Sequence, residues 1–338
     1  MRKRIVIVVI VLAIGVIVAP LLTFMVGPAP VDPGTVFGVI AENLGFSVPV
    51  DWSSNIDAIV WRTRVPRVLT GIGAGMTLAI SGVALQALIR NPLAEPFILG
   101  INSGASTGAA IAILVIGAHS VVGVPLLAFL GAIAALVFVM IAAGGHGATS
   151  SRLVLAGLAV GYAATALTNL LIFTASNVEA GQAVLFWMLG SLSRADWSSA
   201  TIAISTGLAL TVILFVVAPV LDALAAGDST ARSIGVNPGL ARATILIVVS
   251  AGIAFIVSVS GGIGFVGLVI PHLCRGLVGH THRGLVLAST LAGAIFLIGA
   301  DAIARTVLAP AELPIGVITG VVGAPFLLLL MRAQNKPF

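Results

Sequence analysis

Long apolar runs follow one another along almost the whole chain, and they constrain its fold more than any other feature. The stretches Ile5–Met25 and Leu208–Leu221 contain no charged residue. A helix of about 20 apolar residues crosses a bilayer, and only helices and closed barrels satisfy all their backbone polar groups there. Strands of a membrane barrel alternate apolar and polar residues, whereas these runs are continuous. The sequence therefore predicts an all-α polytopic membrane protein.

The composition excludes a soluble domain. Of the 338 residues, 59% are hydrophobic and only 8% are charged, and the mean hydropathy is +1.21. A soluble domain carries roughly 25% charged residues, so this chain has too few to cover a surface that faces water. We attribute its net charge of +5 to membrane anchoring and expect membrane lipid, not nucleic acid, as its surroundings.

The apolar runs predict about ten transmembrane helices in a single domain that spans residues 1–338. A shorter apolar piece at 180–192 is expected to lie at the interface or to re-enter the membrane. The segment 27–61 is expected to be the longest polar connection. The ten predicted helices are 5–26, 66–89, 96–117, 121–143, 151–174, 198–221, 241–259, 263–279, 285–305 and 314–332.

The basic residues predict the orientation, because cytoplasmic loops carry an excess of Lys and Arg. With ten helices, eleven basic residues fall on one side and five on the other, which predicts that both termini lie in the cytoplasm. We expect the chain in the cell's plasma or inner membrane. The eleven are Arg2, Lys3, Arg4, Arg90, Arg152, Arg232, Arg242, Arg275, Arg283, Arg332 and Lys336, and the five are Arg62, Arg64, Arg67, Arg194 and Arg305.

Motifs of catalysis are missing from the sequence. It contains no HExxH, GxSxG, Walker A or CxxC motif, so we expect no catalytic residue, no cofactor and no metal site in this chain. His280 and His282 flank a short basic turn, where we favour a solvated turn over metal ligation. Carboxylates within the predicted helices are scarce, which argues against an ion-driven transporter. Asp301 is the clearest case, and we expect it to pair with Arg305 at i,i+4.

The segment 222–238 is the most polar of the connections predicted to be cytoplasmic. We expect a short helix here, capped by Asp228 or Ser229 and ended by Gly235. Its length and polarity favour a surface for a partner protein over a simple connector.

Several motifs occur together along the chain after the first predicted helix. They are Arg64-Val65-Pro66-Arg67, Asn91-Pro92-Leu93-Ala94-Glu95-Pro96, Pro271-His272, Asp301 with Arg305, and Glu312-Leu313-Pro314-Ile315-Gly316. Together they resemble one family, the FecCD permeases, which are membrane subunits of ATP-binding cassette (ABC) importers for iron siderophores, haem and vitamin B12. The resemblance covers residues 60–332. At Glu95 the family often has Asp, which is a conservative departure.

The resemblance implies the type II ABC importer permease fold, with ten transmembrane helices in each of two permease subunits, identical or paralogous. It also implies an external substrate-binding protein and a cytoplasmic ATPase dimer, which holds the ATP and Mg²⁺. By this resemblance Arg64, Arg67 and Arg305 pair with glutamates of the binding protein. The helices that couple to the ATPase fall on 222–238, with Gly227, Asp228, Ala231, Arg232 and Gly235 as the coupling residues.

We therefore expect an import permease for a ferric siderophore, driven by ATP hydrolysed in a partner subunit. Haem or vitamin B12 import is the alternative within the family. An ion-driven secondary transporter and a membrane-embedded enzyme are less favoured alternatives from other classes.

Overall fold

The computed structural model describes residues 2–27, 31–117, 123–145 and 149–334, and within these ranges all regular structure is helical. Met1, Pro28, Pro30 and Lys336 lie outside the described residues. The prediction of an all-α membrane protein is confirmed. Seven of the described helices are long and apolar enough to cross a membrane, and three shorter apolar helices accompany them.

Helices occupy all ten of the ranges that the apolar runs predict. They are α1 (Arg2–Met25), α4 (Val65–Ile89), α5 (Ile101–Ala110), α6 (Gly123–Ala143), α7 (Ser150–Phe173), α9 (Trp197–Val216), α12 (Pro238–Ser260), α13 (Val266–Val278), α14 (His282–Thr306) and α15 (Ile315–Gln334). A 3₁₀ turn, η2 (Pro96–Leu99), precedes α5, and a π-helical segment, η3 (Ile111–Ile116), continues it. The short apolar piece is α8 (Val178–Met188).

The long polar segment before α4 is more ordered than the sequence analysis expected. It contains α2 (Pro33–Asn43), whose first turn is capped by the Asp32 side chain. The short helix α3 (Ser54–Asp57) and the π-helical η1 (Ala58–Arg64) then run directly into α4. Val36 and Val39 of α2 are fully buried. The Asp-Pro cap was readable in the sequence, but the polarity of the segment hid the buried face.

Two of the short helices begin later than predicted, because the preceding backbone is left-handed. Gly100 has φ +70° and ends η2 just before α5. Phe265 has φ +67° immediately before α13, a conformation that is uncommon for an aromatic residue. Both residues therefore mark breaks in the helical path that hydropathy does not reveal.

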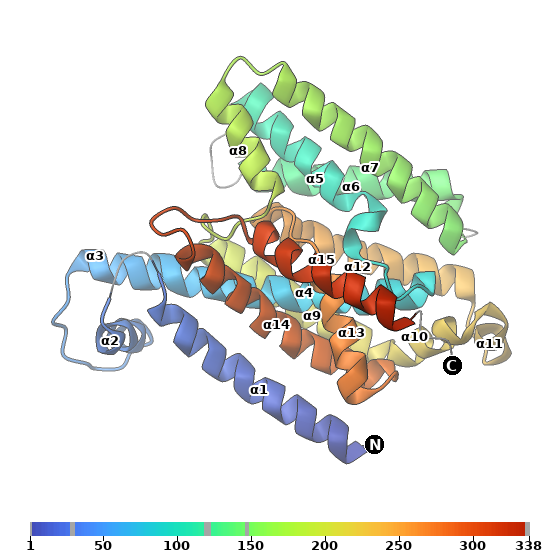
Figure 1. The fold of residues 1–338 in the computed structure, drawn as a ribbon, viewed down its shortest axis with the longest axis horizontal. Coiled ribbons are helices and arrows are strands. Elements are labelled where there is room, and N and C mark those ends of the chain that lie inside the picture. The colour runs from blue at the N-terminus through green and yellow to red at the C-terminus, as the bar shows by residue number, and fades with distance from the viewer. Residues whose placement is uncertain (1, 28–30, 118–122, 146–148, 335–338) are drawn as a thin grey trace.

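Helix α4 forms the centre of the bundle, between α14 and α9. Its glycines allow this close approach: a methyl group on Gly75 would lie 2.2 Å from the Gly293 carbonyl oxygen of α14. On its other side, a methyl group on Gly73 would lie 2.2 Å from the Ala203 carbonyl carbon of α9. In lipid the hydrophobic effect does not drive helices together, and small residues favour association because they allow close van der Waals packing. In Figure 1, α5, α6, α7 and α8 form a group above this central set.

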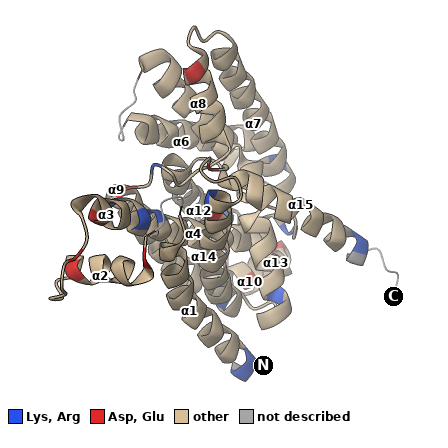
Figure 2. Ribbon diagram, turned by 60° about the vertical axis from the view of Figure 1, so that its left-hand side comes forward, with Lys and Arg blue, Asp and Glu red and all other residues tan. Residues whose placement is uncertain are grey.

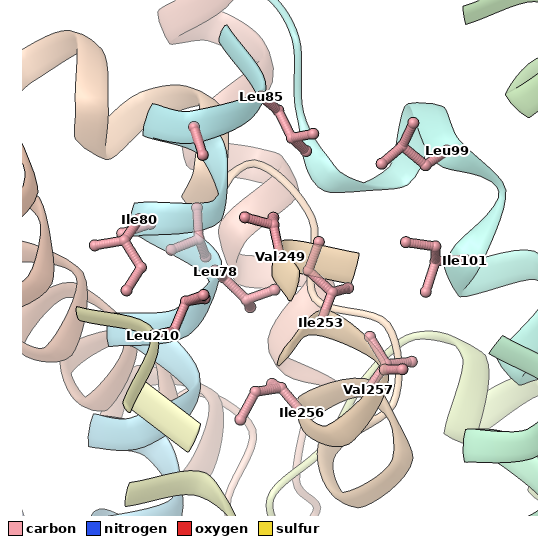
Figure 3. Close-up of a cluster of buried hydrophobic side chains, with 14 of the residues drawn as sticks. Leu78, Ile80, Leu85, Leu99, Ile101, Leu210, Val249, Ile253, Ile256 and Val257 are labelled. Atoms are coloured by element: carbon pink, nitrogen blue, oxygen red, sulfur yellow. The ribbon is translucent and has the colours of Figure 1, made fainter. Parts of the chain in front are cut away.

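The apolar core lies where α4 meets α9 and α12. Figure 3 shows Leu78 of α4 near Leu210 of α9 and facing Val249 and Ile253 of α12. All four side chains are at most 3% exposed. This packing fixes the position of α4, whose two ends carry the polar sites described next.

The bundle has two polar ends. We call them the Arg67 end and the Arg90 end, because Arg67 lies in the first turn of α4 and Arg90 is the C-cap of that helix. The Arg67 end also carries Arg305 and the last turn of α1, while the Arg90 end carries Arg4 and His282. In Figure 1, α2 and α3 lie at the left and α10 and α11 at the right. Figure 2 shows a largely uncharged ribbon, with charged residues around α2 and α3.

Candidate functional site

At the Arg67 end, two arginines from different helices share one carboxylate. Arg67 of α4 donates through Nε and Nη2 to Asp301 of α14, at 3.0 and 2.9 Å to Oδ1. Arg305 lies one turn further along α14, and its Nε is 3.1 Å from Asp301 Oδ2. The predicted i,i+4 pair is therefore confirmed. Glu312, in the connection before α15, accepts from Arg67 Nη1 at 2.9 Å.

Two arginines of this end also hold the C-terminal end of α1. Arg64 Nη1 donates to the Phe24 carbonyl oxygen at 2.9 Å, and Arg305 Nη1 donates to that of Val26 at 2.7 Å. The last carbonyl groups of a helix have no partner within it and favour positive charge. The arginines thus attach α1 to η1 and α14.

The guanidinium groups at this end are buried. Arg64, Arg67 and Arg305 are 4%, 5% and 2% exposed, and Asp301 is 1% exposed. The structure therefore places the three arginines of the predicted docking site together but beneath the surface. Their role in docking stays a prediction. Arg62 and Arg194 are exposed near this end. They lie close in sequence to Trp61 and Trp197, whose ring centroids are 4.7 Å apart.

At the Arg90 end, the predicted coupling segment forms two short helices. They are α10 (Ala218–Ala226) and α11 (Asp228–Ser233). The helix α9 ends at Val216, and α10 then begins with Pro219 in its first turn, so the predicted helix 198–221 is divided. The break follows from proline, which has no N–H to donate within a helix.

The predicted cap of α11 is wrong. Gly227 takes the cap position without a side-chain hydrogen bond. Asp228 instead accepts from Arg242 of α12 at 2.9 Å and lies 3.3 Å from Arg90 Nη2. A carboxylate that binds two arginines from neighbouring elements fixes α11 against the bundle.

The five predicted coupling residues differ in exposure. Ala231 is fully buried, whereas Arg232 and Gly235 are exposed. Gly235 has φ +83° and open space around it, and the helix before it ends at Ser233. Gly227 and Asp228 are half-buried, so Arg232 and Gly235 are the most accessible of the five.

A cavity of about 520 Å³ opens next to this segment. Residues of α4, α10, α13 and α14 line it, together with residues of the connections between helices, and its ionisable side chains are all arginine or histidine. These are Arg90, His272, Arg275, His280 and His282. His282 is anchored by Asp222, whose Oδ1 lies 2.5 Å from its Nδ1. Among the described residues, no group of three or more His, Cys, Asp or Glu has the arrangement of a metal site.

The motif residues gather where irregular segments cross inside the bundle. Glu95 accepts from the backbone N–H of Phe265 at 3.3 Å, and Pro96 lies against Gly267 of α13. Gly316 donates its backbone N–H to Leu189 at 3.0 Å. Irregular backbone inside a membrane protein persists only where such partners bury it. The motifs therefore mark breaks between helices.

Of the remaining motif residues, Asn91 supports a turn, and two prolines lie inside or next to helices. The Asn91 side chain accepts from the Leu93 backbone N–H at 2.9 Å and closes the turn around Pro92. Pro271 lies inside α13, and Pro314 directly precedes α15.

Sequence reasoning missed three features of these sites. Asp222 and Asp228 had no recognisable partner, because the residues they bind are 60 and 14 positions away. The pairing of Arg67 with Asp301 joins residues 234 positions apart. The left-handed Phe265 had one signal, the run of glycines that precedes it.

Comparison with protein-family models matches residues 10–333 to the FecCD transport family. A Helicobacter pylori protein described as an iron chelatin transport system permease is 40% identical over 284 residues, covering 83% of this chain and 85% of its own length. The hemin transport system permease HmuU of Yersinia pestis is 36% identical over 307 residues, covering 87% and 90%.

A vitamin B12 import permease of Salmonella paratyphi A is also 36% identical, over 294 residues, with 85% of this chain and 88% of its own length covered. Among solved structures, a transporter described as of the metal-chelate ABC type, in an inward-facing conformation, superimposes with a TM-score of 0.82 at 28% identity. The match covers 96% of this chain and 98% of that one.

Proposed function

Because this chain belongs to the FecCD transport family of ABC transporter permeases, we propose that it is the membrane-spanning subunit of an importer for a ferric siderophore. The observation that carries this proposal is the family match over residues 10–333. The relative that is 40% identical serves iron chelatin transport, which favours an iron chelate as the substrate. Haem and vitamin B12 are the alternatives, since relatives that are 36% identical serve those ligands.

In this proposal two permease subunits, identical or paralogous, form the transport pathway between them, and a dimer of ATPase subunits supplies the energy. The ATPase, with its ATP and Mg²⁺, acts at the Arg90 end, where the exposed Arg232 and Gly235 are available for contact. Basic residues gather at this end: Arg90 and Arg242 bind Asp228, and Arg275 lines the cavity. The positive-inside rule favours this end as the cytoplasmic one.

The external binding protein docks at the Arg67 end in this proposal. The arginines assigned by resemblance, Arg64, Arg67 and Arg305, are paired within the chain. A carboxylate of the binding protein would therefore have to share or displace an internal partner to reach them. Of the two carboxylates that pair with these arginines, Glu312 is the more accessible, with its side chain 23% exposed against 2% for Asp301. Arg62 and Arg194 are exposed and offer charge for the first encounter.

The proposal is tested by uptake of radiolabelled ligands, with the label on iron for the siderophore and haem and on cobalt for cobalamin. Cells that lack other siderophore uptake would express this chain with its ATPase and binding protein, and ferric siderophore, haem and cobalamin would be supplied separately. The proposal predicts that cells accumulate iron from the siderophore. Cells that carry an ATPase variant unable to hydrolyse ATP should accumulate none. If the cells take up only haem or only cobalamin, that ligand is the substrate in place of the ferric siderophore. Uptake that persists without ATP hydrolysis would refute the proposal.

A further inference from the structure

The cavity at the Arg90 end has the lining of an anion site. Two arginines and three histidines face it, and no carboxylate is among the described residues that line it. The neighbouring carboxylates are already engaged at its edge, Asp222 with His282 and Asp228 with Arg90. A volume of about 520 Å³ lies within the range of small-molecule sites. Arg90 is paired with Asp228, whereas no ion pair joins Arg275 to a described residue, so the uncompensated positive charge of the lining lies on Arg275.

Two buried polar atoms of this lining lack a partner. Arg275 Nη1 and Gln86 Oε1 are both inaccessible to solvent and make no hydrogen bond with any described residue. The Gln86 amide is held in place, because its Nε2 donates to the Gly267 carbonyl oxygen at 3.2 Å. Buried donors and acceptors normally have partners. Neither atom reaches the open space of the cavity, so a ligand there would contact the accessible parts of the lining, and the Arg275 guanidinium keeps a donor that no described residue satisfies.

We propose that this cavity binds a phosphate group, either free phosphate or the headgroup of an anionic phospholipid. Phosphate oxygens match the fork of donors on an arginine.

The surroundings provide access for both sources. Leu273 and Leu277 of α13 are 49% and 44% exposed and offer an apolar track beside the cavity for acyl chains. Arg4 of α1 donates to the Gly276 carbonyl oxygen at 3.1 Å, so the basic start of α1 adds positive charge at the rim. The proposal does not depend on the identity of the transported substrate.

The test uses the purified full-length chain in a neutral maltoside detergent. Its apparent melting temperature is measured in sodium phosphate against sodium chloride at equal ionic strength and pH, and with phosphatidylglycerol against a neutral glycolipid. A ligand that binds only the folded state raises the melting temperature with concentration. We expect a saturable rise of a few °C with at least one of the two. A rise with phosphate identifies the free anion, and a rise only with the lipid identifies the headgroup.

Variants determine whether the rise comes from this cavity. Arg275→Gln should abolish it, and Arg283→Gln should retain it, because Arg283 is exposed at the same end and does not line the cavity. If Arg275→Gln does not fold, His280→Gln serves as the second variant, because His280 lines the cavity and is exposed. This variant should weaken the apparent affinity for the phosphate ligand severalfold.

Three results would overturn the proposal. The first is no rise with either ligand. The second is an unchanged rise in both Arg275→Gln and His280→Gln. The third is an Arg275→Gln variant that loses assembly with the ATPase while the wild-type chain shows no phosphate effect, which would assign the cavity to an acidic side chain of that partner.

Discussion

The two polar ends of this bundle handle charge in opposite ways. At the Arg67 end, Arg67, Arg305 and Asp301 are at most 5% exposed and bind one another. At the Arg90 end, the carboxylates lie at the rim: the Asp222 and Asp228 side chains are 45% and 34% exposed. The first arrangement joins helices, whereas the second leaves an open basic cavity. Charge at the Arg67 end therefore chiefly determines stability, and charge at the Arg90 end is available to ligands and partners.

The largest effect is expected from Asp301→Asn at the buried end. It leaves two buried guanidinium groups without the carboxylate they share, and breaking a buried pair costs about 3–5 kcal/mol. Folded yield and the apparent melting temperature in detergent should both fall sharply. Asp51→Asn, at an exposed position, is the matched control and should leave both unchanged. An Asp301→Asn variant as stable as this control would remove the contrast between the ends.

A smaller loss is expected from Glu312→Gln. The amide oxygen still accepts from Arg67, so only the charge of a side chain that is 23% exposed is lost. We expect a cost of about 1 kcal/mol, since solvent screens part of the interaction. Thermal melting should rank this variant between Asp301→Asn and the wild-type chain. A loss as large as that of Asp301→Asn would mean that Glu312, not Asp301, is the main partner of Arg67.

Reversal of the exposed arginines separates docking from stability. Arg62→Glu and Arg194→Glu should change stability by less than about 0.5 kcal/mol, as exposed substitutions do. Binding of the external protein, measured as association rate against salt concentration, should nevertheless slow at least tenfold in the double variant. Arg283→Glu at the opposite end is the control. Normal association in the double variant would exclude these residues from the docking surface.

The smallest effect on stability is expected from Arg232→Glu in α11. Its side chain is exposed, so melting should be unchanged to within about 0.5 kcal/mol. If α11 contacts the ATPase, uptake should fall at least tenfold while the ATPase itself stays active. Arg332→Glu, another exposed position, should transport normally. Wild-type uptake by Arg232→Glu would argue against contact through α11.

Each of the ten apolar runs was correctly predicted to be helical, because a continuous run favours a helix over the alternating strands of a barrel. The helices α2 and α3 of the polar segment were not predicted. The sequence also predicted the pair of Asp301 with Arg305, which depends only on helical spacing. The depth of the arginines could not be predicted. The distribution of Lys and Arg along the sequence shows that an arginine lies near a helix end. Whether that arginine is buried depends on partners such as Asp301, which is 234 positions from Arg67.

That difference changes how two sequence-based hypotheses are tested. Substitution of Arg64 or Arg305 by Glu would place a carboxylate at a buried position, because these residues are only 4% and 2% exposed. A loss of uptake could then come from failed docking or from misfolding, and the experiment would not distinguish them. A bulky charge at Ala231 has the same problem, since Ala231 is fully buried. The exposed Arg62, Arg194 and Arg232 avoid it.

The functional account depends on which end faces the cytoplasm. Single cysteines can test this, because the native Cys274 is buried and can be replaced by Ala as a background. Thr230→Cys reports on the Arg90 end and Arg194→Cys on the Arg67 end, and both positions are exposed.

A thiol reagent that cannot cross the membrane is applied to intact cells and to inverted membrane vesicles. The account predicts that Arg194→Cys reacts in cells and is protected in inverted vesicles, and that Thr230→Cys reacts only in inverted vesicles. The opposite pattern would place the Arg90 end outside and contradict the assignment of both partner surfaces.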